Sequence, residues 1–259
     1  MAAITHYYQS LDSATITVNS FGTDANHTVN NLYDRCKSLY WKSGNANTSG
    51  SLDIDLGVAR ACTSLVLGSH NYTSTSVGIK LAVGTTDDGN FANLEFVVGD
   101  AGSYHNYAAA NATNWLETFN STNKRYWRLA LQAMGSATYQ QLGTIFLGAT
   151  FAHTINWNYG GELGSQWGVE MRETAGGIRR RQKNHDERKS WAFTFEYMNE
   201  THHTNLMTFL RAVYGNYYPF FFSDEAGSLY YVSMASNRHA RPNTQYQFYN
   251  YPMVMEEEI

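Results

Sequence analysis

Hydrophobic residues recur at every second position along much of the chain. Leu52, Ile54 and Leu56 alternate with Asp53 and Asp55. A period of two places the apolar side chains on one face of a β-strand and the aspartates on the other. The same alternation, or a short apolar run bounded by turn residues, recurs in five further segments: 61–68, 77–83, 94–98, 126–131 and 143–148. Many short strands joined by Gly-, Asn- and Ser-rich connections predict an all-β fold, either a sandwich or a barrel.

The pattern changes near residue 151. A loop-rich passage at 152–168 leads into strands expected at 166–172, 190–198, 219–222, 228–234 and 245–255. We therefore expect a β-sandwich at 1–150 and a smaller β-rich domain at 151–259.

One helix is predicted in the second domain, at about 201–214. Asn199 or Thr201 can cap its start, and Gly215 supplies its stop. Its apolar residues recur at spacings of three and four, which places them on one helix face. These residues are Leu206, Phe209, Leu210, Val213 and Tyr214.

Composition narrows the function classes. Hydrophobic residues make up 43% of the 259 residues, which is enough for a full core, whereas charged residues make up only 15%. The net charge of −4 provides no global field for nucleic acid. The chain begins without the basic and apolar segments of a signal peptide, and no apolar stretch is long enough for a membrane span. Cys36 and Cys62 can pair, but reduced thiols are the simpler expectation.

Motifs that carry catalysis are missing. The nine histidines are scattered, and no H-E-x-x-H, C-x-x-C, G-x-S-x-G or phosphate-binding glycine motif occurs. The adjacent His202 and His203 are expected to be solvated residues of the first helical turn. Asp53 and Asp55 fit a carboxylate dyad or the solvated face of a strand, and the segment 87–90 fits a calcium loop fragment or a hairpin turn. The sequence predicts no enzyme, catalytic residue, metal site or cofactor.

A basic stretch at 179–189 holds six of the 18 Lys and Arg residues. It fits a solvated hairpin, an arm that contacts another subunit, or a nucleic-acid contact. The absence of interleaved aromatic residues argues against nucleic acid. The candidate subunit contacts are therefore this stretch and the acidic C-terminal segment, namely Arg179, Arg180, Arg181, Lys183, Glu256, Glu257 and Glu258.

Ligands of β-sandwiches usually bind at loops gathered at one end. If every strand crosses the sandwich, the connections 40–51, 69–76 and 99–125 fall at one end and 57–61, 85–93 and 133–142 at the other. The first set is rich in aromatic, imidazole and amide groups, which suit a sugar, a protein neighbour or plain packing. The candidate ligand or partner residues are Trp41, His70, Asn71, Tyr72, Tyr104, His105 and Trp115.

The segment from Tyr33 to Gly148 resembles the discoidin family, the coagulation factor 5/8 type C group of galactose-binding-like sandwiches, in the form found in phage virion proteins. The resemblance is carried by Trp41–Ser43, Leu52–Gly57, Leu65–Asn71, Tyr126–Leu129 and Leu142–Gly148. It implies a jelly-roll sandwich that binds glycans or proteins through its end loops. Secreted members often close the domain with a terminal disulfide, a placement that Cys36 and Cys62 do not match.

The segment from Phe151 onward is similar to phage distal-tail and tail-fibre-adaptor proteins. The similarity is carried by Gly176–Arg180, Trp191–Tyr197, Leu206–Tyr214, Gly215–Phe222 and Met255–Glu258. It implies a structural component of a tail tip or baseplate that connects the tube or hub to fibres. Such a protein is a homo-oligomer, with a ring as one form, is assembled in the host cytoplasm and resides in the virion. The alternative is a virion module that binds a host-surface glycan.

Overall fold

The computed structural model describes most of the chain as strands. Excluded from the description are residues 1–3, 9–10, 12–13, 23, 34, 36–38, 73–77, 85–93, 100–102, 107–113, 136–137, 154–160, 174–176, 178, 236–242, 246–247 and 259. The predicted turn or calcium fragment at 87–90 and the thiol of Cys36 lie outside the described residues. Cys62 is a buried free thiol, and burial raises its pKa to about 12.

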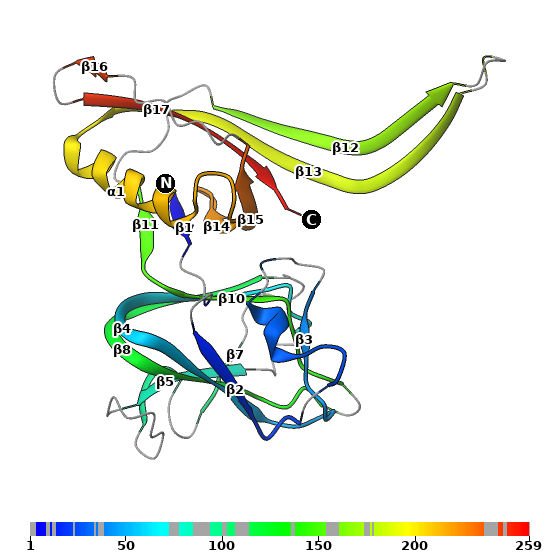
Figure 1. Cartoon of the computed structure of the whole chain (residues 1–259), viewed down its shortest axis with the longest axis vertical. Helices are drawn as coiled ribbons and strands as arrows, with labels where there is room; N and C mark the ends of the chain where they lie inside the picture. Colours follow the sequence, from blue (N-terminus) through cyan, green and yellow to red (C-terminus); the bar gives the residue numbers. More distant parts are fainter. Residues whose placement is uncertain are drawn as a thin grey trace. The chain divides into compact units, whose positions relative to one another are not determined.

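The chain forms two compact units. One is the continuous segment Tyr7–Thr150, and the other combines Met1–His6 with Phe151–Ile259. Both are built mainly from antiparallel strands (Figure 1), so the all-β fold predicted from the sequence is confirmed. Neither helix in the described part of the chain is long and apolar enough to cross a membrane.

The Tyr7–Thr150 unit contains a sheet of order β10-β4-β8-β5-β6, in which β2 also pairs with β4 and β7 with β5. Two short strands, β3 and β9, form a separate pair. The elements are β2 (Thr15–Asn19), the 3-10 helix η1 (Val29–Leu32), β3 (Trp41–Lys42), β4 (Gly50–Gly68), β5 (Gly78–Gly84), β6 (Leu94–Val98), β7 (His105–Asn106), β8 (Asn114–Leu131), β9 (Gln141–Leu142) and β10 (Thr144–Gly148).

Two long strands bend the sheet over its own core. The pairing of β4 with β8 shifts register between Asp55 and Arg60 and again between Cys62 and Ser64. Such irregularities bend a strand without ending it. Leu52 in the first half of β4 and Leu67 in the second therefore enter the same buried cluster. The two halves form the facing layers of a sandwich, and Figure 1 shows the curvature of β4 and β8.

This bend corrects the predicted order of loops. Residues 57–61 form no connection, because they lie within β4, and β8 already begins at Asn114. The segment 133–142 lies beside 40–51 rather than at the opposite end. Asn47 N–H donates to Thr138 O at 2.9 Å, and Ser43 N–H donates to Gln140 O at 3.0 Å. These two segments meet because β4 and β8 are antiparallel, which places Leu131 at the end of β8 opposite Gly50 at the start of β4.

The outer face of this sheet carries ion pairs. Arg128 binds Asp53 through two nitrogens, each 2.6 Å from a carboxylate oxygen. Arg125 binds Asp55 in the same bidentate manner, at 2.6 and 2.8 Å. Guanidinium holds the pKa of Asp55 below its ordinary value. The two aspartates therefore belong to a paired polar face, and each is held by its own arginine rather than by the other carboxylate.

The second unit contains a sheet of order β11-β1-β14-β15-β17-β13-β12, with β16 paired to β17. Its elements are β1 (Thr5–Tyr7), β11 (Thr150–Ala152), β12 (Glu162–Glu173), β13 (Arg179–Met198), the helix α1 (Glu200–Ala212), β14 (Phe220–Ser223), β15 (Leu229–Met234), β16 (Asn243–Gln245) and β17 (Phe248–Glu257).

The helix α1 uses the cap and the stop that the sequence offers, but it ends at Ala212, and Tyr214, expected on its apolar face, lies beyond it and is exposed. Asn199 caps it, since its side chain accepts a hydrogen bond from His202 N–H at 2.8 Å. Gly215 adopts a φ of 71°, and its N–H donates to Leu210 O at 3.0 Å to close the last turn. The apolar face packs on the sheet through Phe209, whose ring centroid lies 4.9 Å from that of Phe220.

Candidate functional site

The predicted ligand residues divide into a buried group and a surface group. Trp41, Tyr72 and Trp115 are at most 3% exposed and belong to the core cluster of the sandwich. Their faces are therefore covered by protein. His70 is also buried, stacks on Tyr72 at 5.1 Å, and has its pKa lowered to about 4 by that burial.

The remaining predicted residues, Asn71, Tyr104 and His105, are partly exposed or exposed. Tyr104 lies under the ammonium of Lys80, 4.4 Å from Nζ to the ring centroid. His105 Nε2 lies 3.1 Å from Glu117 Oε1. Asn71 has a supporting role: its amide donates to Tyr139 O at 2.8 Å and accepts from Gln141 N–H at 3.0 Å. It thereby fixes the backbone that presents the tyrosine.

A different set of side chains gathers beside β3 and β9. We call it the loop-end surface and define it as Asp24, His27, Tyr40, Lys42 and Tyr139. Each of these side chains is partly exposed or exposed. The strand β3 explains the placement of two of them. Because Trp41 points into the core, its neighbours on either side point outward.

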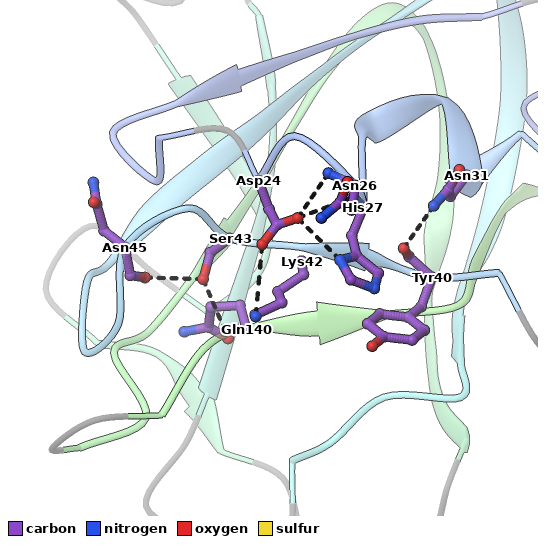
Figure 2. A network of polar contacts seen from close by, with 9 residues as sticks. All are labelled: Asp24, Asn26, His27, Asn31, Tyr40, Lys42, Ser43, Asn45 and Gln140. Atoms are coloured by element: carbon purple, nitrogen blue, oxygen red, sulfur yellow. Dashed lines mark hydrogen bonds and ion pairs between the residues drawn. The ribbon is translucent and has the colours of Figure 1, made fainter.

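The carboxylate of Asp24 organises this surface. It accepts hydrogen bonds from the backbone N–H groups of Asn26 and His27 at 3.0 and 3.1 Å. His27 Nδ1 lies 2.9 Å from the same oxygen, and Lys42 Nζ lies 3.6 Å from the other (Figure 2). These contacts, with the hydrogen bond to His27 as the largest cause, lower the pKa of Asp24 to about 2.

An ionised Asp24 fixes the orientation and tautomer of His27. A carboxylate only accepts hydrogen bonds, so the proton of a neutral His27 ring sits on Nδ1. Its Nε2 then presents a lone pair. The ring stacks on Tyr40 with centroids 4.4 Å apart and planes inclined by 23°. The imidazole is thus held on two sides, by charge and by an aromatic face.

The ammonium of Lys42 is held between charge and an aromatic ring. Besides Asp24, it lies 4.3 Å from the ring centroid of Tyr139, whose side chain is exposed. Behind it, Ser43 Oγ accepts from Gln140 N–H at 3.0 Å and donates to Asn45 O at 2.9 Å. These bonds fix the backbone on both sides, as Figure 2 shows for Ser43, Asn45 and Gln140. The loop-end surface therefore presents a donor, an acceptor and aromatic faces in fixed positions.

Three histidines form a chain in the other unit. His6 Nε2 lies 3.1 Å from His153 Nε2, and His153 Nδ1 lies 3.0 Å from His202 Nε2. All are buried, so the expectation of a solvated His202 is wrong; His203 is buried as well, stacked on Tyr249 at 4.3 Å. These two residues of the first turn of α1 are covered by protein, whereas Glu200 and Thr201 are exposed. The nitrogens form a line and do not converge on one point. Among the described residues, no group of His, Cys, Asp or Glu is placed to hold a metal ion.

The predicted subunit contacts lie in the sheet of the second unit. Arg179, Arg180, Arg181 and Lys183 are exposed on β13. The segment Glu256–Glu258 lies at the end of β17, where Glu257 Oε2 accepts from Lys189 N–H at 3.2 Å. Part of the acidic segment is therefore engaged within its own sheet.

Comparison with known proteins gives matches in fold but none in sequence family. No protein-family model and no curated protein matches the chain. Among solved structures, CpGH89CBM32-5 from Clostridium perfringens, in complex with GalNAc-β-1,3-galactose, is 15% identical; the match covers 56% of this chain and 99% of that one, with a TM-score of 0.43. Chitosan-binding module 1 of a chitosanase/glucanase from Paenibacillus sp. IK-5 is 16% identical over 54% and 99%, with a TM-score of 0.44.

A further match is the family 32 carbohydrate-binding module of NanJ from C. perfringens, in complex with galactose. It is 13% identical over 56% of this chain and 98% of that chain, with a TM-score of 0.42. These structural neighbours are carbohydrate-binding modules, and none of those named here is a phage tail protein. Their identities transfer no residue roles to this chain.

Proposed function

We propose that the chain is a non-catalytic carbohydrate-binding protein and that the loop-end surface binds the glycan. One observation carries the proposal: the stacked pair of His27 and Tyr40 lies beside the Lys42–Asp24 ion pair, with Tyr139 against the ammonium. Sugar rings have apolar C–H faces and hydroxyl edges, so they require an aromatic surface next to fixed donors and acceptors.

Each group has a separate part in this binding. The exposed ring of Tyr139 stacks on the C–H face of a sugar. Lys42 Nζ donates to a sugar oxygen, and His27 Nε2 accepts from a hydroxyl. Because Asp24 holds both of these groups before the ligand arrives, little side-chain entropy is lost on binding.

The charge state of Asp24 favours binding over hydrolysis. A general acid in glycoside cleavage needs a raised pKa, so that its carboxyl is protonated at working pH. The pKa of Asp24 is lowered instead, and its oxygens already accept from His27 and contact Lys42. The carboxylate is therefore assigned a positioning role.

Calorimetric titration of the full chain tests the proposal. Galactose, GalNAc-β-1,3-galactose and chitosan oligosaccharides are suitable first probes, followed by a glycan array. We expect Tyr139→Ala and Lys42→Met each to weaken binding about five- to thirtyfold, since a stacking or charged contact contributes on the order of 1–2 kcal/mol. Tyr217→Ala is the matched control, because Tyr217 is an exposed tyrosine of the other unit.

Two results would show that this assignment is wrong. One is the absence of binding to every glycan on the array. The other is glycan binding that Tyr139→Ala and Lys42→Met leave unchanged, because the sugar would then lie elsewhere.

The second candidate function is a structural one, as a component of a phage tail tip in the virion. The observation that favours it is the exposed basic segment 179–189 on a β-hairpin of the second unit. Its test is mass spectrometry and antibody labelling of purified particles. Absence of the chain from purified virions would end this candidate, and a glycan-binding role would not depend on the result.

A further inference from the structure

The strands β12 and β13 extend past the rest of their sheet. The strand β13 pairs with β17 only from Ser190 onward, whereas its pairing with β12 continues to Arg179 opposite Glu173. We call residues 166–173 and 179–188 the arm; Figure 1 shows the two strands running beyond β17. Among the described strands, none pairs with the outer edge of either arm strand.

A two-stranded ribbon with two open edges is unusual in an isolated protein. Open edges expose backbone donors and acceptors that pair readily with another strand, and natural sheets protect them with Lys or Pro. The strand β12 contains neither residue between Glu162 and Glu173. Two strands alone are marginally stable in water. The β12 edge therefore lacks this protection, and the arm lacks the packing that a permanently solvated hairpin needs.

Three apolar side chains of β12 share one face of the arm. Trp167, Val169 and Met171 are 61%, 53% and 60% exposed. Alternation along β12 places them on the same face, because the register shifts insert the extra residues into β13. On the opposite face the His185 ring lies over Gly168, where an added Cβ would come within 2.2 Å of it. The apolar side chains of β12 are therefore open to solvent, and the β13 residues paired with them on this face are Glu187, Lys183 and Arg181.

The two edges of the arm differ in charge. The arm segment of β12 contains two acidic residues and one basic residue, whereas that of β13 contains five basic and two acidic residues. Arg172 pairs with Glu170, Arg179 with Glu173, and Lys183 with Asp186. Arg180 and Arg181 make no ion pair with any described residue, and both line a shallow hollow at the end of the arm.

We propose that the arm is a self-association surface, in which the β12 edge of one copy pairs with the β13 edge of the next. Charge complementarity identifies the occupant as a second copy: one hairpin carries both an acidic–apolar edge and a basic edge. Such an interface is heterologous, since each copy offers one edge and accepts the other. Repetition of this contact gives a closed ring or an open filament. The proposal is independent of glycan binding.

Sedimentation velocity of the full chain over a concentration series tests this first. We expect association that grows with concentration. Trp167→Ser and Val169→Ser should each weaken it at least about tenfold, because aromatic and apolar groups at the centre of an interface dominate its energy. Val58→Ser is the matched control, since Val58 is a similarly exposed valine in the other unit. A wild-type chain that stays monomeric at every concentration overturns the proposal.

A charge exchange tests the pairing of unlike edges. The double variant E170K/E173K makes both edges basic, and R180E/R181E makes the β13 edge acidic like β12. We expect neither variant to associate alone and an equimolar mixture to associate, because each then finds an edge of opposite charge. If either variant associates as strongly as the wild type, or if the mixture stays monomeric while the wild type associates, the edges are not the contact.

Discussion

At the scale of single residues, ion pairs hold the outer face of β4 against β8. The Asp53 and Arg128 side chains are 14% and 27% exposed and share two short hydrogen bonds. Asn19 Nδ2 adds a third bond to the same carboxylate at 2.6 Å. Partial burial and bidentate geometry distinguish this pair from an ordinary surface ion pair.

Asp53→Ala should lower the free energy of unfolding by about 2 kcal/mol, because it removes two short hydrogen bonds from a partly buried guanidinium. Chemical denaturation of Asp53→Ala, Arg128→Ala and the double variant gives the coupling energy. Arg172→Ala is the control, since that arginine is 78% exposed in its pair with Glu170, and it should cost less than about 0.5 kcal/mol. Equal effects of Asp53→Ala and Arg172→Ala would contradict this account.

The histidine chain makes the second unit sensitive to acid. Burial lowers the pKa of His6 to about 3, and burial with the neighbouring imidazoles lowers that of His153 well below 6.5. Burial also lowers the pKa of His202. Each N–H···N hydrogen bond needs one nitrogen whose lone pair accepts it. A second proton added to the line of three rings would occupy one of these accepting nitrogens and break a hydrogen bond. The folded chain therefore excludes protons that the unfolded chain takes up.

The free energy of unfolding should accordingly be highest above about pH 6.5, which is the pKa of histidine in the unfolded chain, and should decline as the pH falls toward 3. Each imidazole that stays neutral in the fold contributes a slope of about 1.4 kcal/mol per pH unit. His6→Gln should make the decline shallower by about one such contribution. Hydrogen exchange of the α1 backbone amides between pH 7 and pH 4, corrected for intrinsic exchange rates, measures this slope. A slope that is identical in wild type and variant would refute the role of His6.

At the scale of elements, the cap of α1 is the simplest point to test. Asn199→Ala removes the bond to His202 N–H and should cost about 1 kcal/mol of unfolding free energy. Asn205→Ala, at an exposed position within the same helix, is the matched control and should be neutral or slightly stabilising because alanine favours helix. Thermal unfolding followed at the helical circular dichroism band compares them. Loss of equal size in both variants would argue against the cap.

Element type was predictable where local chemistry decides it. The alternation of Leu52, Ile54 and Leu56 and the cap and stop of α1 gave the correct elements, because each signal lies within a few residues. The bend of β4 was not predictable. Gly57 marks it with a φ of 76°, but the strand continues because β8 follows it with matching register shifts. A glycine that bends a paired strand looks in sequence like one that ends it.

The loop-end surface was less predictable for the same reason. Sequence reasoning selected Trp41, the largest aromatic residue of its loop, yet the period of two buries Trp41 and exposes Tyr40 and Lys42. The spacing of Asp24 and His27 was the one local signal, since an aspartate often binds backbone N–H groups two and three residues later. The approach of Tyr139 depends on pairing of β3 with β9 across about a hundred residues, which no local pattern encodes.

At the scale of the whole molecule, two surfaces lie on two separate compact units. If the loop-end surface and the arm act independently, Tyr139→Ala should leave the sedimentation profile unchanged, and Trp167→Ser should leave the calorimetric affinity for a soluble monovalent sugar unchanged. On a multivalent glycan surface, however, Trp167→Ser should weaken retention, because association multiplies the sites per particle. The avidity is measured by comparing retention on the glycan surface with affinity for the sugar in solution. Equal retention of the wild type and Trp167→Ser on the glycan surface would contradict the expected avidity.

The position of β1 has a consequence for the order of folding. This strand lies between β11 and β14, and Ile4 O accepts from His153 N–H at 2.9 Å. A ribosome releases the partners of β1 only after the whole Tyr7–Thr150 unit has emerged. This strand must therefore wait, unpaired, while the intervening unit folds, and its sheet closes afterwards, by capturing a segment made before that unit.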